Sequence, residues 1–257
     1  MAIQQAIKQA ISRTDINYDD MLIVVREIMS GDATAAQIAG LLVALNMKGE
    51  TIDEVTAAAT VMREFATKVE VSATPLLDTC GTGGDGSQTF NISTACAFVA
   101  SAAGAYVAKH GNRSVSSSSG SADVLEKLGV NINLSAASVE NCINETGIGF
   151  MFAPAHHSAT RHAAGPRKEL GVRTLFNVLG PLTNPANAPI QLMGIFDRKW
   201  QKIAIEVLAR LGTKRAFVVT ADDGLDEMSI TSNTHIASLI DNEISYFDIN
   251  PADYGFD

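Results

Sequence analysis

Two polar stretches in the first half of the chain have the residue types that bind phosphate groups. The first, residues 81–86, reads GTGGDG and is too rich in glycine for a helix or a strand. Glycine lets consecutive backbone N–H groups converge on an anion, because no Cβ blocks the approach. The second, residues 109–119, begins KHGNR, which supplies two cations, and continues into a run of serines. Together the two stretches favour a ligand that carries more than one phosphate.

Each polar stretch is expected to follow a short strand, at 76–77 and at 105–108, with a helix through residue 103 between them. Asn91 to Thr94 would open that helix and add two hydroxyls to its first turn. The free N–H groups and partial positive charge of a helix N-terminus suit phosphate. Ligands of parallel sheets bind at the carboxyl ends of the strands, where both stretches would lie.

An acidic segment, DDGLDE at 222–227, follows another expected strand, 215–220. Taken alone, the segment is equally consistent with a solvated turn. Beside two phosphate-binding stretches, Asp226 and Glu227 are better interpreted as ligands of Mg²⁺, either directly or through water.

Two other sets of residues do not indicate chemistry of their own. His156, His157 and His162 are close in sequence but lack the HExxH arrangement of a zinc site. The three cysteines have no paired spacing, which indicates reduced thiols, and Cys80 is expected to be a small core residue.

Composition narrows the class of protein. The 257 residues are 46% hydrophobic and 18% charged, as in a globular protein, and no apolar run approaches the roughly 20 residues that span a bilayer. The net charge of −9 argues against a general nucleic-acid surface, which needs a broad basic face. Residues 1–10 do not form a signal peptide. We expect a cytoplasmic enzyme that binds neither nucleic acid nor membrane.

The pattern of apolar residues changes near residue 70. Before it, apolar residues recur at helical spacing, and Thr34 and Thr51 are plausible N-caps. After it, strands alternate with helices, which predicts a mainly parallel sheet. The further strands are expected at 148–153, 190–196, 215–220, 236–241 and 244–249, the last two forming a hairpin that turns at Asn242-Glu243, and the further helices at 121–128, 136–146 and 199–211.

We therefore predict an α/β protein in two domains. Residues 1–70 form a small all-helical domain, joined by helices from about 155–185, and residues 71–257 form a larger α/β domain with a mainly parallel sheet.

Seven motifs in this order make the chain resemble the anthranilate phosphoribosyltransferases: DTCGTGGD (78–85), NIST (91–94), KHGNR (109–113), GSAD (120–123), GPR (165–167), NVLGPLTNP (177–185) and DE (226–227). The resemblance implies the nucleoside phosphorylase/phosphoribosyltransferase type of fold. It also implies transfer of the phosphoribosyl group of phosphoribosyl pyrophosphate (PRPP) to the amine of anthranilate, in tryptophan biosynthesis. A cytoplasmic homodimer joined through its helical domains, with Mg²⁺ as cofactor, is implied as well.

The same resemblance implies site residues. Those of the PRPP site are Gly81, Gly84, Asp85, Thr89, Asn91, Ile92, Ser93, Thr94, Lys109, His110, Gly111, Asn112, Arg113, Ser114, Val115, Ser116, Ser117 and Ser121. Those of the metal site are Ser93, Asp226 and Glu227, and those of the anthranilate site are Gly81, Asn112 and Arg167. A guanidinium such as that of Arg167 can hold a carboxylate through two parallel hydrogen bonds. His110 is the nearest candidate for a general base.

The chain departs from the family pattern at two places. Many members carry a lysine where this chain has Ser118, so hydroxyls would replace one phosphate contact. The family also continues beyond the position of Asp257, so this sequence is expected to be truncated, with its α/β domain incomplete.

Two other functions remain open at this stage. Pyrimidine-nucleoside phosphorylases resemble this family in fold and in both polar stretches but use free phosphate, and the motifs at 165–167 and 177–185 favour anthranilate. A non-catalytic, nucleic-acid-binding relative is disfavoured by the acidic balance and by the intact Asp226-Glu227 pair.

Overall fold

The computed structural model describes residues 2–84, 86, 89–114 and 119–256. The chain divides into two compact units. The helical unit is made of Met1–Ala66 and His157–Thr183, and the α/β unit is made of Thr67–His156 and Asn184–Asp257. Each unit therefore draws on two separate stretches of sequence.

The helical unit is built from amphipathic helices. Their bounds are α1 Ala2–Ile11, α2 Tyr18–Ser30, α3 Ala35–Lys48, α4 Ile52–Glu64, α9 Arg161–Leu170 and α10 Phe176–Leu182, with a 3₁₀ turn, η1, at Ser158–Thr160. Thr34 and Thr51 cap α3 and α4 in reciprocal capping boxes, so both N-cap predictions are confirmed. The fully buried aliphatic side chains of α1–α3, such as Ile3, Ile28 and Leu45, form the core.

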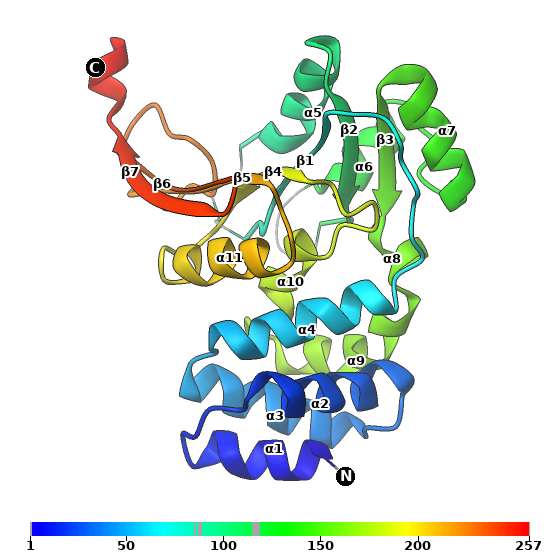
Figure 1. Ribbon diagram of the computed structural model, residues 1–257, viewed down its shortest axis with the longest axis vertical. Helices are drawn as coiled ribbons and strands as arrows, with labels where there is room; N and C mark the ends of the chain where they lie inside the picture. The colour runs from blue at the N-terminus through cyan, green and yellow to red at the C-terminus, as the bar shows by residue number, and fades with distance from the viewer. Residues whose placement is uncertain (1, 85, 87–88, 115–118, 257) are drawn as a thin grey trace. The chain divides into compact units, whose positions relative to one another are not determined.

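The α/β unit contains one mixed sheet, which the described residues form with seven strands in the order β3-β2-β1-β4-β5-β6-β7 (Figure 1). Their bounds are β1 Leu76–Gly81, β2 Tyr106–Gly111, β3 Ile148–Phe152, β4 Ile190–Gly194, β5 Arg215–Ala221, β6 Thr234–Ile240 and β7 Glu243–Ile249. The first five in that order are parallel, and β6 and β7 are antiparallel to their neighbours. The predicted fold class, with a mainly parallel sheet, is confirmed.

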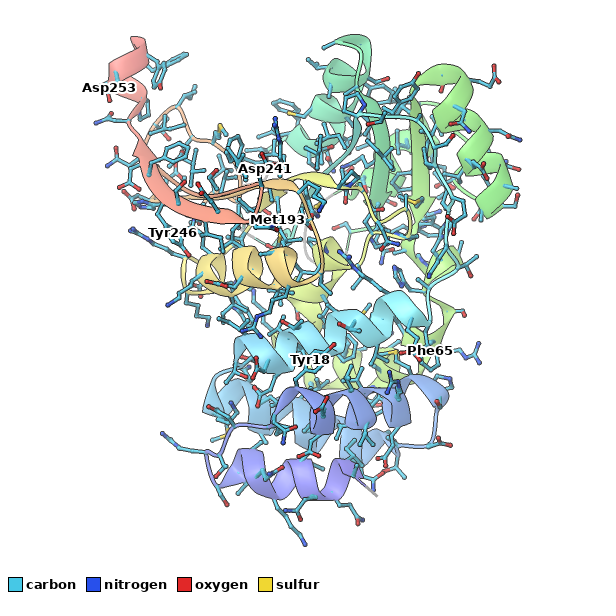
Figure 2. All side chains as sticks on the ribbon, viewed as in Figure 1. Tyr18, Phe65, Met193, Asp241, Tyr246 and Asp253 are labelled. Carbon is cyan, nitrogen blue, oxygen red and sulfur yellow. The ribbon has the colours of Figure 1, made fainter. Side chains whose placement is uncertain are left out.

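Helices pack along the sheet and bury its centre. They are α5 Ile92–Ala102, α6 Ser121–Lys127, α7 Ala136–Thr146, α8 Ala153–His156 and α11 Lys199–Arg210, with a 3₁₀ turn, η2, at Pro251–Tyr254. Met193, on the central strand β4, is fully buried, whereas Tyr246, on the edge strand β7, is 52% exposed (Figure 2). None of the helices in the described ranges has the length and hydropathy needed to cross a membrane.

Several predicted boundaries were wrong. The strand predicted at 76–77 is longer, because β1 pairs with β4 as far as Gly81, which had been predicted to lie in the glycine loop. The hairpin turns at Asp241-Asn242 and not at Asn242-Glu243. Asp241 and Asn242 have the positive φ values of the turn, 48° and 71°. A two-residue turn of this kind matches the twist of the strands, and Asp and Asn tolerate the conformation. Lys109 and His110 were predicted to begin a loop, but they lie inside β2, where the backbone pairs with β3 as far as Gly111.

Candidate active site

The glycine loop after β1 is attached to the end of β4. Thr82 N–H donates to the carbonyl oxygen of Gly194 at 3.0 Å, and Thr82 Oγ1 accepts from Phe196 N–H at 3.1 Å. Gly83 then has a φ of 63°, a left-handed conformation that favours glycine. The loop therefore begins from a fixed point at the carboxyl edge of the sheet.

The acidic segment after β5 meets this loop directly. Gly83 N–H donates to Asp226 Oδ2 at 2.9 Å, so the structure brings together two segments that are 143 positions apart in the sequence. A Cβ added to Gly81 would lie 2.9 Å from the same oxygen. Asp226 is only 8% exposed. Of the two residues predicted to bind metal here, Asp226 thus has a fixed place beside the glycine loop.

The first turn of α5 supplies the hydroxyls of Ser93 and Thr94. Asn91 is the N-cap, and its Oδ1 accepts from Thr94 N–H at 3.0 Å and lies 3.3 Å from Ser93 Oγ. Thr94 is buried, and its Oγ1 has no hydrogen-bond partner among the residues described. A buried hydroxyl without a partner at a helix N-terminus is suited to an anionic ligand.

Lys109 lies under the same helix turn. It extends from β2 and is 3% exposed, and its Nζ donates to the carbonyl oxygen of Thr79 at 2.5 Å and to Ser93 Oγ at 3.2 Å. Burial lowers the pKa of Lys109, and the negative charges of Asp78 and Glu227 oppose this shift. Lys109 therefore interacts with the Ser93 hydroxyl through a hydrogen bond and with the negative charge of Glu227 electrostatically.

His110, on β2, contacts Asp78, on the neighbouring strand β1. His110 N–H donates to Asp78 Oδ1 at 3.3 Å, and both residues are buried, at 7% and 1% exposure. Burial raises the pKa of the Asp78 carboxyl, while Lys109 and Asn184 act in the opposite direction. The role of His110 as a general base stays a prediction.

Arg113 is turned toward α6. Its guanidinium contacts the carboxylates of Asp123 at 3.0 Å and Glu126 at 2.8 Å and lies 5.8 Å from the ring centre of Phe152. The two carboxylates neutralise the charge of Arg113. For Arg113 to contact PRPP as predicted, a phosphate would have to replace these carboxylates as its partner. Ser121 Oγ donates to the carbonyl oxygen of Asn112 at 3.3 Å, which keeps the start of α6 beside β2. The predicted site residues Asp85, Val115, Ser116 and Ser117 lie outside the described residues, as does Ser118.

Arg167 belongs to the helical unit. It lies on α9 with its guanidinium carbon 5.1 Å from the ring centre of Phe176, and burial lowers its pKa. Within the described residues no carboxylate pairs with it. A partly buried guanidinium that stacks on an aromatic ring and has no acidic partner is suited to a ligand carboxylate.

The residues near the glycine loop fit Mg²⁺ better than a transition metal. In the described ranges there is no group of three or more His, Cys, Asp or Glu side chains placed to hold an ion. Mg²⁺ does not need one, because it is usually bound through one or two carboxylates together with waters and substrate phosphates. The Asp226 carboxylate and the Ser93 hydroxyl are oxygen donors of that kind, and Glu227 lies near them.

Comparison with known proteins identifies the family of this chain. An anthranilate phosphoribosyltransferase from Thioalkalivibrio sulfidiphilus is 58% identical over 257 residues, which cover 100% of this chain and 76% of that protein. One from Teredinibacter turnerae is 57% identical over 256 residues, with 100% and 75% covered. This chain belongs to the anthranilate phosphoribosyltransferase family. It spans about three quarters of the length of these family members.

Two family models match consecutive parts of the chain. The helical bundle domain of the glycosyl transferase family matches residues 4–66, and the a/b domain of that family matches residues 73–257.

Solved structures of anthranilate phosphoribosyltransferases have the same fold. The enzyme from Thermus thermophilus superimposes with a TM-score of 0.90 at 43% identity, covering 98% of this chain and 74% of that one. The enzyme from Saccharomyces cerevisiae in complex with PRPP and Mg gives 0.80 at 27% identity, with 93% and 68% covered. The same yeast enzyme in complex with 4-fluoroanthranilate gives 0.79 at 26% identity, with 93% and 68% covered.

The structure adds three residues that were not among the predicted site residues. Gly194 and Thr82 attach the glycine loop to β4, and Thr79 Oγ1 donates to the carbonyl oxygen of Ser93 at 2.9 Å. A glycine at the end of a buried strand was a usable signal for Gly194, since it permits close approach of another backbone. Thr79 and Thr82 lie in the motif at 78–85, but their contacts could not be predicted, because their partners are distant in the chain.

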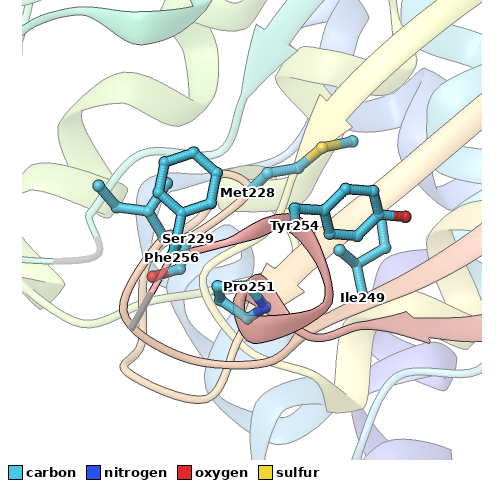
Figure 3. A pocket seen from close by; sticks show the side chains of 7 residues that line it. Met228, Ser229, Ile249, Pro251, Tyr254 and Phe256 are labelled. Atoms are coloured by element: carbon cyan, nitrogen blue, oxygen red, sulfur yellow. The ribbon is translucent and has the colours of Figure 1, made fainter.

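Two pockets adjoin the acidic segment. One of about 520 Å³ lies between residues 89–92, after the glycine loop, and residues 223–231. The other, of about 280 Å³, is lined by Met228, Ser229, Ile230, Ile249, Pro251, Tyr254 and Phe256 (Figure 3). The linings of both pockets are mostly apolar.

A histidine between two carboxylates anchors the start of the acidic segment. His235, on β6, lies 2.7 Å from Asp222 Oδ1 through Nε2 and 2.7 Å from Asp248 Oδ1 through Nδ1, and Arg198 Nη1 is 3.1 Å from Nε2. Burial opposes protonation, but the bonds to the two carboxylates outweigh it and raise the pKa of His235. The positive charge of Arg198 acts against them.

We expect His235→Gln to destabilise the protein more at pH 6 than at pH 9. The raised pKa means that the stabilising effect of the charged ring is complete below its ordinary pKa of about 6.5 and is lost as the pH rises through the raised value. The loss in Tm should be about 2–4 °C larger at pH 6, which corresponds to about 1 kcal/mol in a chain of this size. Thermal unfolding of both proteins at the two pH values measures it. An equal loss at both pH values would contradict the raised pKa of His235.

Proposed function

We propose that this chain transfers the phosphoribosyl group of PRPP to the amine of anthranilate, giving N-(5-phosphoribosyl)anthranilate and pyrophosphate in tryptophan biosynthesis. The observation that carries the proposal is the hydrogen bond from Gly83 N–H to Asp226 Oδ2 at 2.9 Å. It joins the glycine loop to the acidic segment, so anion-binding N–H groups lie beside a metal-binding carboxylate. A diphosphate with its bound cation needs that combination.

In this reaction the chain acts mainly by positioning and by neutralising charge. The amine nitrogen forms a bond to C1 of the ribose as the C1–O bond to pyrophosphate breaks, and the amine gives up a proton. N–H groups of the glycine loop and of the first turn of α5 stabilise the charge that grows on the leaving oxygen. Holding the two substrates in line lowers the barrier further.

Asp226, Glu227 and Ser93 would hold Mg²⁺. When bound, the ion neutralises negative charge on the pyrophosphate group. The protein residues fix where that charge must lie, because Asp226 is tied to Gly83 and Ser93 is tied to Asn91 and Lys109.

Five measurements test the proposal on the 257-residue protein. We expect pyrophosphate to form with PRPP, anthranilate and Mg²⁺ together, and not in the two controls from which anthranilate or Mg²⁺ is omitted. A fourth measurement offers a pyrimidine nucleoside and inorganic phosphate, and a fifth follows DNA binding across a salt series. Nucleoside cleavage would favour a phosphorylase, and DNA binding without turnover would favour a non-catalytic protein. PRPP binding without pyrophosphate release would contradict the proposal.

We further propose that Arg167 binds the carboxylate of anthranilate. Arg167→Ala should raise KM for anthranilate about ten- to a hundredfold, because hydrogen bonds to charged groups contribute about 1.5–3 kcal/mol. KM for PRPP should change little. Arg167→Lys should recover only part of the affinity, since an ammonium cannot form the paired bonds. Steady-state kinetics with each substrate varied in turn measure the effect.

Arg161→Ala is the matched control, because Arg161 is on the same helix, is exposed and has no assigned role. It should leave both KM values unchanged. If Arg167→Ala leaves KM for anthranilate and turnover as in wild type, the assignment is wrong.

The location and the oligomeric state are proposed from the resemblance to the family. We infer a cytoplasmic homodimer that associates through the helical unit. Sedimentation of the protein across a concentration series would report its mass, and a monomer at all concentrations would contradict the dimer.

A further inference from the structure

The Asp223 carboxylate closes the loop between β5 and β6. Its Oδ2 accepts from Ser229 Oγ at 2.6 Å and from Thr231 Oγ1 at 2.8 Å, and its Oδ1 accepts from Leu225 N–H at 3.2 Å. The first two donors lie where the chain returns toward β6, and the third lies where it leaves β5. One side chain therefore joins the outgoing and the returning part of the loop.

Both partners of the shortest of these bonds lie close to a strand. Asp223 follows the end of β5, which is Ala221. Ser229 is 8% exposed, and its N–H donates to the hydroxyl of Thr234, the first residue of β6, at 3.0 Å. The hydrogen bond between Asp223 and Ser229 therefore fixes the base of the loop to the sheet.

The hydrogen bonds of Asp223 decide between two roles for its carboxylate. An ionised carboxylate has about four lone-pair sites, and a ligand of a cation must offer some of them to the ion. Asp223 uses three within the loop. The bonds from Ser229 and Thr231 lower the pKa of Asp223, so the carboxylate is charged and is a strong acceptor. Asp223 is thus well placed to hold the loop and poorly placed to hold an ion as well.

The path of this loop determines where Asp226 lies. Asp226 is midway between Asp223 and Ser229 in the chain, and its Oδ2 accepts from Gly83 N–H at 2.9 Å. A loop that opened at its base would let Asp226 move away from the glycine loop. The contact of Asp223 with Ser229 and the contact of Asp226 with Gly83 are therefore expected to depend on each other.

We propose that Asp223 is a positioning residue, which closes the loop so that Asp226 and Glu227 face the bound cation and diphosphate, and that it does not bind the cation itself. The inference rests on the proposed function and names how the acidic side of that site is set up. Because Asp223 acts on the loop, its loss should loosen Asp226 from Gly83 even when no ligand is bound. A direct ligand of the cation would have no such effect.

Hydrogen exchange of the Gly83 amide tests the effect without any ligand, because this N–H donates to Asp226. Asp223→Ala should speed the exchange by about fivefold or more, as expected when a typical hydrogen bond is weakened. Asp223→Asn should change it much less, because the amide oxygen of Asn can still accept within the loop. Two-dimensional NMR of the 257-residue protein measures the rates. An unchanged rate in Asp223→Ala overturns the proposal.

Binding of Mn²⁺, a paramagnetic substitute for Mg²⁺, is measured for the same variants in the presence of PRPP and without anthranilate. The free Mn²⁺ signal in electron paramagnetic resonance gives the affinity. Asp223→Ala should weaken binding by about tenfold, the lower end of the effect of a group that orients a metal ligand. Asp223→Asn should weaken it less than about threefold, since it loses the charge and keeps an acceptor. Equal losses in the two variants would show that the charge of Asp223 acts on the ion, which overturns the proposal.

A second variant covers the case in which Asp223→Ala does not fold, as circular dichroism would show. Ser229→Ala removes a donor to Asp223 and leaves every carboxylate in place. It should speed exchange of the Gly83 amide and weaken Mn²⁺ binding, each several-fold. Wild-type values of both quantities in Ser229→Ala overturn the proposal.

Asp32→Ala is the matched control for loss of one carboxylate, because Asp32 is exposed in the loop after α2. It should change neither quantity. Since the exchange of the Gly83 amide is measured without PRPP or a metal ion, it tests the role of Asp223 whether or not the protein turns over. A failure of the proposed reaction would be recognised separately in the pyrophosphate assay.

Discussion

Replacing Asp226 with Asn is expected to lower kcat/KM for PRPP by about a hundredfold or more while the fold is retained. A bound metal ion contributes several kcal/mol of charge stabilisation, and about 1.4 kcal/mol corresponds to a factor of ten. Asn keeps the size of the side chain and an oxygen that can accept from Gly83 N–H, so the bond at 2.9 Å can persist. What the substitution removes is the negative charge.

Asp226→Ala separates charge from anchoring. It removes the charge and also the acceptor of the Gly83 N–H, so it should lower activity at least as much and reduce Tm as well. Asp253→Asn is the control for loss of one carboxylate, because Asp253 is exposed in η2. Turnover is measured against Mg²⁺ concentration for each variant. Wild-type kcat/KM in Asp226→Asn, with an unchanged dependence on Mg²⁺, would show that this carboxylate does not bind the ion.

The regular elements near the site could be predicted from the sequence because their signals are local. The helix 136–146 has its cap, Ser135, and its ending glycine, Gly147, beside it in the chain, and the structure has the same bounds. The boundary of β2 could not be predicted in this way. Lys109 and His110 are polar, and only pairing with β3 shows that they belong to a strand.

In the candidate site, the residues could be predicted from the sequence but their contacts could not. Family motifs indicated Ser93, Lys109 and Asp226 as individual residues, and their spacing says nothing of how they contact one another. The bond between Gly83 and Asp226 joins positions that are 143 residues apart, and it depends on the order of strands in the sheet. The partners of Arg113 likewise follow from the path of α6 beside β2, which no local pattern records.

Gly194→Ala should impair the site and the stability of the protein together. A Cβ at this position would overlap the backbone carbonyl oxygen of Asp226 and lie 2.8 Å from its carbonyl carbon, so the acidic segment would have to move. Overpacking of this kind costs about 1–3 kcal/mol, which corresponds to a fall in Tm of roughly 2–12 °C. Displacing Asp226 from Gly83 should also lower kcat/KM for PRPP by about tenfold or more, since even groups that only orient a ligand have effects of that size.

Gly40→Ala is the matched control for this effect, because the added methyl group meets nothing closer than Ile7 Cδ1 at 3.8 Å inside a helix. There, alanine should leave kinetics unchanged and stabilise the helix by about 0.5–1 kcal/mol. The contrast between the two glycines isolates contact with Asp226 from the general effect of adding a methyl group. Gly194→Ala with wild-type Tm and kinetics would mean that the acidic segment moves away without consequence, and the close approach of β4 would then have no part in positioning Asp226.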